Sequence, residues 1–270
     1  MTNTAKYAVI TGASKGLGKA FAHELAAMGK NLILVSLPGE GLNGIGEELK
    51  TKFGVEVACY ETDFYVDENI LKFTDWVNEN FQVEILINNA GIGGSRSFTE
   101  ASNEYLRHII QLNITSPIFV LHKILPNLLK QEKAWILNVA SMASFSPIGF
   151  KTVYPASKRF IQHFSRGLQE ELKNTGICIS CVYPGPMRTN PTVSTRIEKY
   201  GFWGRFILMT PEQVASKSIR RMMKNDRNII LGWPNKFYWF MMTRFPPRMV
   251  LQVVTRFVKN ELIREKQKAK

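Results

Sequence analysis

The stretch YAVITGASKGLGKAF, residues 7–21, contains the pattern that decides the fold. Its first five residues are a short apolar run, typical of a buried strand. The turn that follows, TGASKGLG, has three glycines: Gly12, Gly16 and Gly18. Glycines permit a tight turn and a close backbone approach, and the helix predicted next would offer free N–H groups and a positive dipole end to phosphate. The pattern favours a dinucleotide site, although a glycine-rich loop alone also fits an ordinary turn.

Apolar runs alternate with helical patterns along most of the chain. The runs are mostly continuous, which is typical of a sheet covered on both faces. Strands are predicted at residues 7–11, 31–36, 56–61, 84–90, 134–140, 177–184 and 228–232. Helices are predicted at residues 16–28, 42–53, 67–80, 102–129, 154–174 and 211–224. The alternation predicts an α/β fold, a single-domain doubly wound (Rossmann-type) parallel sheet of about seven strands with helices on both faces.

Two segments, at about 187–209 and 234–270, do not fit this alternation of strands and helices. Residues 1–233 are interpreted as the dinucleotide-binding and catalytic domain, with a substrate loop at about 187–209 that is rich in aromatic residues. Residues 234–270 are interpreted as a basic, aromatic, helical C-terminal extension, because apolar residues recur at helical spacing from 248 to 263.

The stretch VYPASK, residues 153–158, suggests a proton donor. Proline fits the first turn of a helix, so Tyr154 is predicted at a helix entrance. Residues four apart share a helix face, which would bring the Lys158 ammonium toward the Tyr154 phenol. A neighbouring cation stabilises the phenolate, so we expect Lys158 to lower the pKa of Tyr154. Taken singly, each residue also fits packing or a solvated face.

The glycine spacing G-x-x-x-G-x-G resembles that of the short-chain dehydrogenase/reductase family, and six further motifs in the same order extend the resemblance over about residues 1–232. The motifs are Asp63, NNAG (88–91), Asn113, Ser141, the Tyr154/Lys158 pair and PGPMRT (184–189). The resemblance implies four catalytic residues: Ser141, Tyr154, Lys158 and Asn113. It also implies a cofactor site made of Gly12, Ser14, Lys15, Gly16, Leu17, Gly18, Ser36, Asp63, Asn89, Ala90, Gly91, Tyr154, Lys158, Pro184, Gly185 and Thr189.

The resemblance further implies a reaction. A bound nicotinamide would supply hydride, and Tyr154 would give a proton to the carbonyl oxygen. Ser141 would hydrogen-bond that oxygen, and Lys158 would also bind the nicotinamide ribose. Asn113 would hold a water that links Lys158 to solvent.

The end of the second predicted strand bears on the choice of cofactor. It reads LVSLPGE, with Ser36 and Leu37 where family members that prefer NAD usually have an acidic residue. Lys15 before the second glycine resembles a residue of NADP-dependent members, whereas Leu37 lacks their second basic contact and Glu40 lies close by. NADP (NADPH) is therefore favoured over NAD, with a merely solvated Lys15 as the competing interpretation.

Composition limits the kinds of protein and of functional site that the chain could have. With 45% hydrophobic residues in 270, the chain can form a full core. Three cysteines suit a reducing compartment, and Cys178 and Cys181 are predicted to pack in a strand rather than to form a redox pair. The histidine and cysteine spacings predict no metal site.

The formal charge of +13 is concentrated in the extension, where nine Lys and Arg stand against two Glu. A basic amphipathic helix is typical of a membrane surface, and a helix docked on the domain or on a partner subunit is the alternative. The extension resembles, by composition, that of the 17β-hydroxysteroid dehydrogenase and very-long-chain 3-oxoacyl-CoA reductase group, and more loosely that of 3-ketosphinganine reductases.

The sequence therefore predicts an NADPH-dependent reductase of a ketone in a lipophilic substrate, such as a 3-oxoacyl, ketosphinganine or steroid-like compound. The alternatives are a reductase of small soluble ketones and a catalytically idle NADP(H)-binding sensor or assembly module. We expect a cytoplasmic protein that is peripheral to an anionic membrane through residues 235–270, forms a homo-oligomer and binds no nucleic acid.

Overall fold

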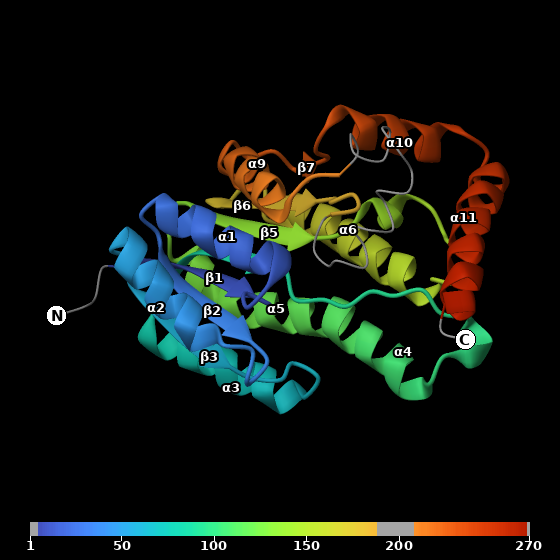
Figure 1. Ribbon diagram of the computed structural model, residues 1–270. Coiled ribbons are helices and arrows are strands. Elements are labelled where there is room, and N and C mark those ends of the chain that lie inside the picture. The colour runs from blue at the N-terminus through green and yellow to red at the C-terminus, as the bar shows by residue number, and fades with distance from the viewer. Residues whose placement is uncertain (1–4, 188–207, 269–270) are drawn as a thin grey trace.

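The structure, a computed structural model, describes residues 5–187 and 208–268. A central sheet lies between two layers of helices, and the C-terminal helices α10 (Trp233–Arg244) and α11 (Pro247–Lys268) stand at one end of it (Figure 1). The expected substrate loop at 187–209 falls almost wholly outside the described residues, and its two ends, Met187 and Met209, form a parallel bridge.

Seven parallel strands form the sheet, in the order β3-β2-β1-β4-β5-β6-β7. The strands are β1 (Lys6–Thr11), β2 (Asn31–Ser36), β3 (Val57–Glu61), β4 (Gln82–Asn88), β5 (Ala134–Val139), β6 (Ile177–Val182) and β7 (Asn228–Ile229). The chain reverses direction across the sheet between β1 and β4, which is where open α/β sheets bind ligands. The predicted fold class is confirmed.

Each face of the sheet has its own hydrophobic core, because successive strand side chains point to opposite faces. In β1, Ala8 and Ile10 join one core and Tyr7 and Val9 the other. The first core is completed by α1 (Gly16–Ala27), α2 (Leu42–Phe53) and α9 (Pro211–Met223). The second is completed by α3 (Asp67–Asn80), α5 (Ser116–Leu129) and α6 (Val153–Glu171). Continuous apolar strands therefore have partners on both sides, as predicted.

The helix predicted at 102–129 is interrupted. It consists of α4 (Asn103–Ile110), a π-helical turn η2 (Gln111–Thr115) and α5. Within the described residues, Asn103–Leu129 is the one helical stretch long and apolar enough to cross a membrane. Its Val120, Leu121, Ile124 and Leu128 are buried in the second core, so the stretch serves as a core helix of the fold.

The C-terminal extension packs on the segment between β5 and α6. It is helical as predicted, but the chain breaks into two helices at Phe245 and Pro246, where proline disfavours helical geometry in the residue before it. The Trp239 ring meets Phe145 of the short helix η3 (Met142–Phe145), and the Thr255 hydroxyl accepts the Gly149 N–H at 2.9 Å. The extension is thus fastened to the segment between β5 and α6.

The glycine turn predicts a clear effect on stability. A Cβ atom on Gly18 would lie 1.9 Å from the Gly12 carbonyl oxygen, so Gly18→Ala forces the backbone to move. We expect it to lower the free energy of unfolding by about 2 kcal/mol or more, measured by urea denaturation. Gly44, exposed within α2 with open space at its Cβ position, is the control: Gly44→Ala should stabilise by about 0.5–1 kcal/mol. Equal effects of the two substitutions would contradict the packing argument.

Candidate active site

The glycine turn is fastened to the end of β4 by Thr11. The Thr11 hydroxyl accepts the backbone N–H groups of Asn89 and Ala90, each at 3.0 Å. In return, the Asn89 side-chain amide donates to the carbonyl oxygens of Thr11 at 2.9 Å and Gly12 at 3.1 Å. The turn after β1 and the loop after β4 therefore form one rigid unit at the point where the sheet changes direction. Sequence reasoning identified Asn89 and Ala90 but missed Thr11, whose residue type is also common in ordinary strands.

The turn fits a dinucleotide pyrophosphate. Gly12 and Gly16 have left-handed φ values of +67° and +55°, which side chains rarely adopt. Helix α1 begins at Gly16, and among the described residues its N-cap, Lys15, makes no side-chain capping bond and its first turn has no acidic residue. The helix N-terminus thus keeps N–H groups and a positive dipole end for an anion.

A carboxylate lies beside this turn. Ser14 donates its hydroxyl to one oxygen of Glu40, and the Lys15 amine pairs with the other at 2.5 Å. These two hydrogen bonds hold the pKa of Glu40 below its usual range, with the lysine contributing most. The Ser36 hydroxyl is turned to the Leu37 carbonyl oxygen at 3.1 Å. The predicted cofactor residues Ser14 and Lys15 are therefore engaged by Glu40.

Asp63 lies at the end of β3. Its carboxylate accepts the Tyr65 N–H at 2.8 Å, which fixes the turn that follows the strand. The neighbouring Thr62 N–H is donated to the Ser36 carbonyl oxygen at 2.8 Å. Asp63 thus lies at the β2–β3 side of the ligand-binding edge.

The structure brings Tyr154 and Ser141 together. Tyr154 lies in the first turn of α6, as predicted, and the side chain of Ser141, which follows β5, is near enough to the phenol to favour a lower pKa. The Ser141 hydroxyl also accepts the Ala143 N–H at 3.1 Å as the N-cap of η3, which fixes its position. Residues that are 13 apart in sequence form a pair because β5 ends, and α6 begins, at the same edge of the sheet.

Lys158 is buried, with 6% of its surface exposed, and its amine donates to the Val139 carbonyl oxygen at 3.0 Å. A Cβ atom on Gly91 would lie 3.2 Å from this amine, so the loop after β4 closes over the lysine. Burial lowers the pKa of Lys158 to about 8. The lysine therefore titrates close to physiological pH.

The expected effect of Lys158 on Tyr154 does not appear. Burial raises the pKa of Tyr154 above its ordinary value, and the hydrogen bond with Ser141 acts in the opposite direction. Lys158 contributes no resolved shift to the phenol, because its amine is directed to Val139 and both groups lose water on burial. Burial therefore keeps the phenol neutral and able to donate its proton.

Asn113 joins three parts of the site from within the π-helical turn η2. Its carbonyl oxygen accepts the Ile92 N–H at 2.9 Å. Its amide donates to the Ile92 carbonyl oxygen at 2.9 Å and to the Ser157 hydroxyl at 3.0 Å. Ser157 donates in turn to the Tyr154 carbonyl oxygen at 2.8 Å. The side chain that the resemblance assigned to holding a water thus positions the loop after β4 and the start of α6.

The loop after β6 completes the site. The Pro184 carbonyl oxygen accepts the Met142 N–H at 3.0 Å, which ties this loop to η3. Gly185 packs closely against Asn235 of α10, whose amide donates to the Leu231 carbonyl oxygen at 2.9 Å. Thr189, also predicted to bind the cofactor, lies outside the described residues.

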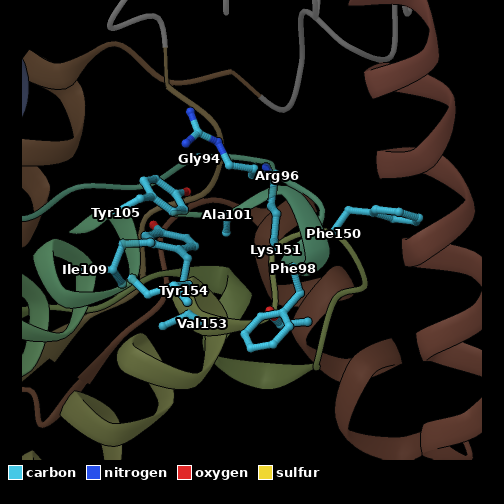
Figure 2. Close-up of a pocket in the computed structure, with 12 residues that line it drawn as sticks. Gly94, Arg96, Phe98, Ala101, Tyr105, Ile109, Phe150, Lys151, Val153 and Tyr154 are labelled. Carbon is cyan, nitrogen blue, oxygen red and sulfur yellow. The ribbon is translucent and has the colours of Figure 1, made fainter. Parts of the chain in front are cut away.

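A pocket opens beside Tyr154 (Figure 2). Tyr105 lies near Tyr154 on one side, with the Arg96 guanidinium 4.6 Å from the Tyr105 ring centre. Much of the remaining wall is apolar, and these residues are Phe98, Ala101, Leu106, Ile109, Phe150 and Val153. Phe150 has a left-handed φ of 61° and its carbonyl oxygen accepts the Arg96 N–H at 2.7 Å. Sequence reasoning found Tyr154 but missed this wall, since its residues come from two separate segments.

Comparison with known proteins agrees with this geometry. The model of the family described as short chain dehydrogenase matches residues 6–199. The chain belongs to the short-chain dehydrogenase family. It is therefore an oxidoreductase of the CH–OH/C=O type. The family match includes the glycine turn, Asn113, Ser141, Tyr154 and Lys158.

Relatives and solved structures extend the match. The chain is 31% identical to a very-long-chain 3-oxoacyl-CoA reductase from Anas platyrhynchos, over 95% of this chain and 83% of the relative. A similar alignment to the reductase of that name from Mus musculus is 32% identical and spans 66% of this chain and 58% of the relative. A 7β-hydroxysteroid dehydrogenase structure superposes with a TM-score of 0.83 at 22% identity, covering 94% of this chain and 96% of its own. A short-chain dehydrogenase from Sphingobium yanoikuyae in complex with NADPH superposes with a TM-score of 0.75 at 25% identity, covering 86% and 91%.

The buried lysine predicts a pH-dependent stability. Its folded-state pKa of about 8 lies below the ordinary 10.5, so the unfolded chain binds the proton more tightly. Wild-type protein should therefore lose stability as the pH falls from 10.5 toward 8, while Lys158→Met should not share this loss. We expect the stability of the variant relative to wild type to rise by about 2 kcal/mol between pH 10 and pH 7.5, measured by urea denaturation. A difference that stays constant over this interval would show that Lys158 is not desolvated.

Proposed function

We propose that this protein is an NADPH-dependent reductase of a ketone in a lipophilic substrate, with Tyr154 as the proton donor. The single observation that carries the proposal is the Tyr154–Ser141 pair beside a largely apolar pocket. Bound at the glycine turn, the nicotinamide cofactor would supply the hydride. The protein must then deliver a proton to the carbonyl oxygen and stabilise the negative charge that develops there.

Tyr154 and Ser141 suit these two tasks. Because burial raises the pKa of Tyr154, the phenol carries its proton at neutral pH and can give it to the substrate oxygen. The Ser141 hydroxyl is held by its bond to Ala143 and can hydrogen-bond the same oxygen. Lys158, close to the loop after β4, would contribute positive charge and bind the cofactor ribose below its pKa of about 8.

NADP(H) is the cofactor that the residues favour. Lys15 is 79% exposed at the turn, and no carboxylate stands at Ser36 or Leu37 to accept a ribose 2′-hydroxyl. The NADPH complex of the Sphingobium yanoikuyae enzyme supports this choice. Glu40 is the opposing feature, because its carboxylate engages both Ser14 and Lys15.

The substrate class follows from the wall of the pocket. Most side chains of the wall beside Tyr154 are apolar or aromatic, with Arg96, Lys151 and Thr152 as its other polar members, and such walls favour an apolar substrate. The relatives named as very-long-chain 3-oxoacyl-CoA reductases support a 3-oxoacyl substrate among the lipophilic ketones. A reductase of small soluble ketones would not need this wall, and an idle NADP(H)-binding protein would not need the Tyr154–Ser141 pair.

The proposal includes a membrane surface as partner. Trp233 and Phe237 stack on α10 and expose 72% and 53% of their surfaces. Further exposed large apolar side chains of the C-terminal extension are Tyr238, Trp239, Phe240, Phe245, Met249, Leu251, Val253, Phe257 and Ile263. A hollow at the start of α10 is lined by Lys217, Arg220, Arg221 and Lys236. Apolar anchors beside cations suit an anionic lipid surface, from which a lipophilic substrate would also come.

Tyr154→Phe tests the catalytic proposal. Removing the phenol oxygen should lower kcat/KM for NADPH-dependent reduction at least about 100-fold, because the proton donor is lost. The Kd for NADPH, measured by fluorescence, should stay within about twofold, because the ring and the fold remain. The substrates are a panel of 3-oxoacyl thioesters, ketosphinganine, steroids and small ketones.

Tyr105→Phe is the matched control, since it removes a second phenol from the same pocket. It should change kcat/KM by no more than a few-fold. Turnover that survives in Tyr154→Phe would contradict proton donation by Tyr154. A wild-type protein that binds NADPH and reduces none of the panel would favour the sensor, and one that reduces only small ketones would remove the lipophilic substrate.

The membrane surface is tested by flotation with vesicles of phosphatidylcholine and phosphatidylserine. The double variant Trp233→Ser/Phe237→Ser should reduce the vesicle-bound fraction several-fold, because two aromatic anchors are lost. Phe160→Ser removes an exposed phenylalanine of α6 and should leave binding unchanged. Wild-type binding should weaken with added salt. Equal flotation of wild type and double variant would contradict the proposal, as would a dimer that the double variant abolishes, since a second copy would then cover the surface.

A further inference from the structure

Glu40 occupies the corner where NADP and NAD differ. It lies in the loop between β2 and α2, four residues after Ser36. Its two oxygens engage the Ser14 hydroxyl and the Lys15 amine, both on the glycine turn. In doubly wound sheets the adenosine ribose lies beyond the end of the second strand. A carboxylate from the β2–α2 loop therefore holds the two donors of the glycine turn that lie nearest that position.

The other polar groups at this corner offer little to a phosphate. Ser36 directs its hydroxyl to the Leu37 carbonyl oxygen, and Leu37 is apolar. Ser14 and Lys15 are then the side-chain donors with which this chain could bind a ribose 2′-phosphate. A phosphate and the Glu40 carboxylate are both anions, and repulsion at short range prevents them from sharing the same donors.

We propose that Glu40 is a specificity-determining residue, whose carboxylate competes with the 2′-phosphate of NADP(H) for Ser14 and Lys15. The inference rests on the proposed use of NADP(H). Binding of the phosphate requires Glu40 to leave both donors, which weakens the preference for NADPH. Binding of NAD(H), which lacks the phosphate, leaves Glu40 in place.

The loop is built to let Glu40 leave. Glu40 stands between Gly39 and Gly41, whose φ values are +80° and +72°. A Cβ atom on either glycine would meet nothing within 4 Å, so the backbone on both sides has space in which to turn. A glycine on each side of Glu40 also gives the segment wide conformational freedom. No neighbouring atom within 4 Å of either glycine's Cβ position therefore blocks movement of the carboxylate.

A purely stabilising role for the Lys15–Glu40 ion pair does not explain its position at the glycine turn. The Lys15 side chain is 79% exposed and that of Glu40 23% exposed, so solvent screens their attraction. Exposed ion pairs contribute little to stability. The position of Lys15 and Glu40 at the glycine turn is better explained if the Glu40 carboxylate gives way to a ribose 2′-phosphate.

The test uses the full chain and a ligand that isolates the phosphate. Isothermal titration calorimetry compares adenosine 2′,5′-bisphosphate with 5′-AMP on wild type and Glu40→Gln. The variant should bind the bisphosphate roughly fivefold to tenfold more tightly and 5′-AMP with a Kd within about twofold of wild type. In a Lys15→Met background the gain from Glu40→Gln should shrink, because one contested donor is gone. The ratio of kcat/KM for NADPH to that for NADH should rise by a similar factor.

Glu48→Gln is the matched control. It removes the same charge from α2, where Glu48 pairs with Lys19 at 3.5 Å, and should leave both ligands unchanged. Glu40→Gln with unchanged or weaker binding of the bisphosphate would overturn the inference, as would an equal gain in Glu48→Gln. Tighter bisphosphate binding in Glu40→Gln supports the inference even where wild type proves to use NADH, an outcome that would refute only the proposed cofactor.

Discussion

A single buried cation organises the catalytic end of this fold. The Lys158 amine is removed from water, and such burial costs free energy unless polar groups compensate. The Val139 carbonyl oxygen supplies one compensating bond, and the depressed pKa shows that compensation is partial. A lysine on α6 in this state requires β5 to end beside it and the loop after β4 to close over it. Both conditions are met because the strands are parallel and finish at one edge.

The same requirement explains the unusual geometry around the lysine. Gly91 must lack a side chain, since a Cβ atom there would press on Asn113 and Lys158. Asn113 must face the loop, and it does so from a π-helical turn, which displaces side chains relative to a regular helix. Its bonds to Ile92 and Ser157 connect the loop to the first turn of α6. The position of Tyr154 thus depends on hydrogen bonds that join the loop after β4, the π-helical turn η2 and the first turn of α6.

Much of the fold could be predicted from the sequence, because the signals are local. Apolar runs bounded by turns marked the strands, and the predicted bounds of α2 and α3 agree with the structure. The convergence of Ser141 and Tyr154 followed from strand topology. The direction of the Tyr154 pKa was predicted wrongly, because helical spacing gives neighbours but says nothing of burial. Thr11 and the full engagement of Glu40 were missed because they depend on contacts between distant segments.

Phe150 has a wider implication for the way this pocket was selected. A bulky residue in the left-handed region stores about 1–3 kcal/mol of backbone strain, which glycine would relieve. Selection for a robust fold alone would favour glycine at this position. Phe150 lines the pocket beside Tyr154, and its ring points away from Tyr154 toward α11 (Figure 2). Relieving the backbone strain at this position and keeping the side chain that borders the pocket are therefore opposing demands.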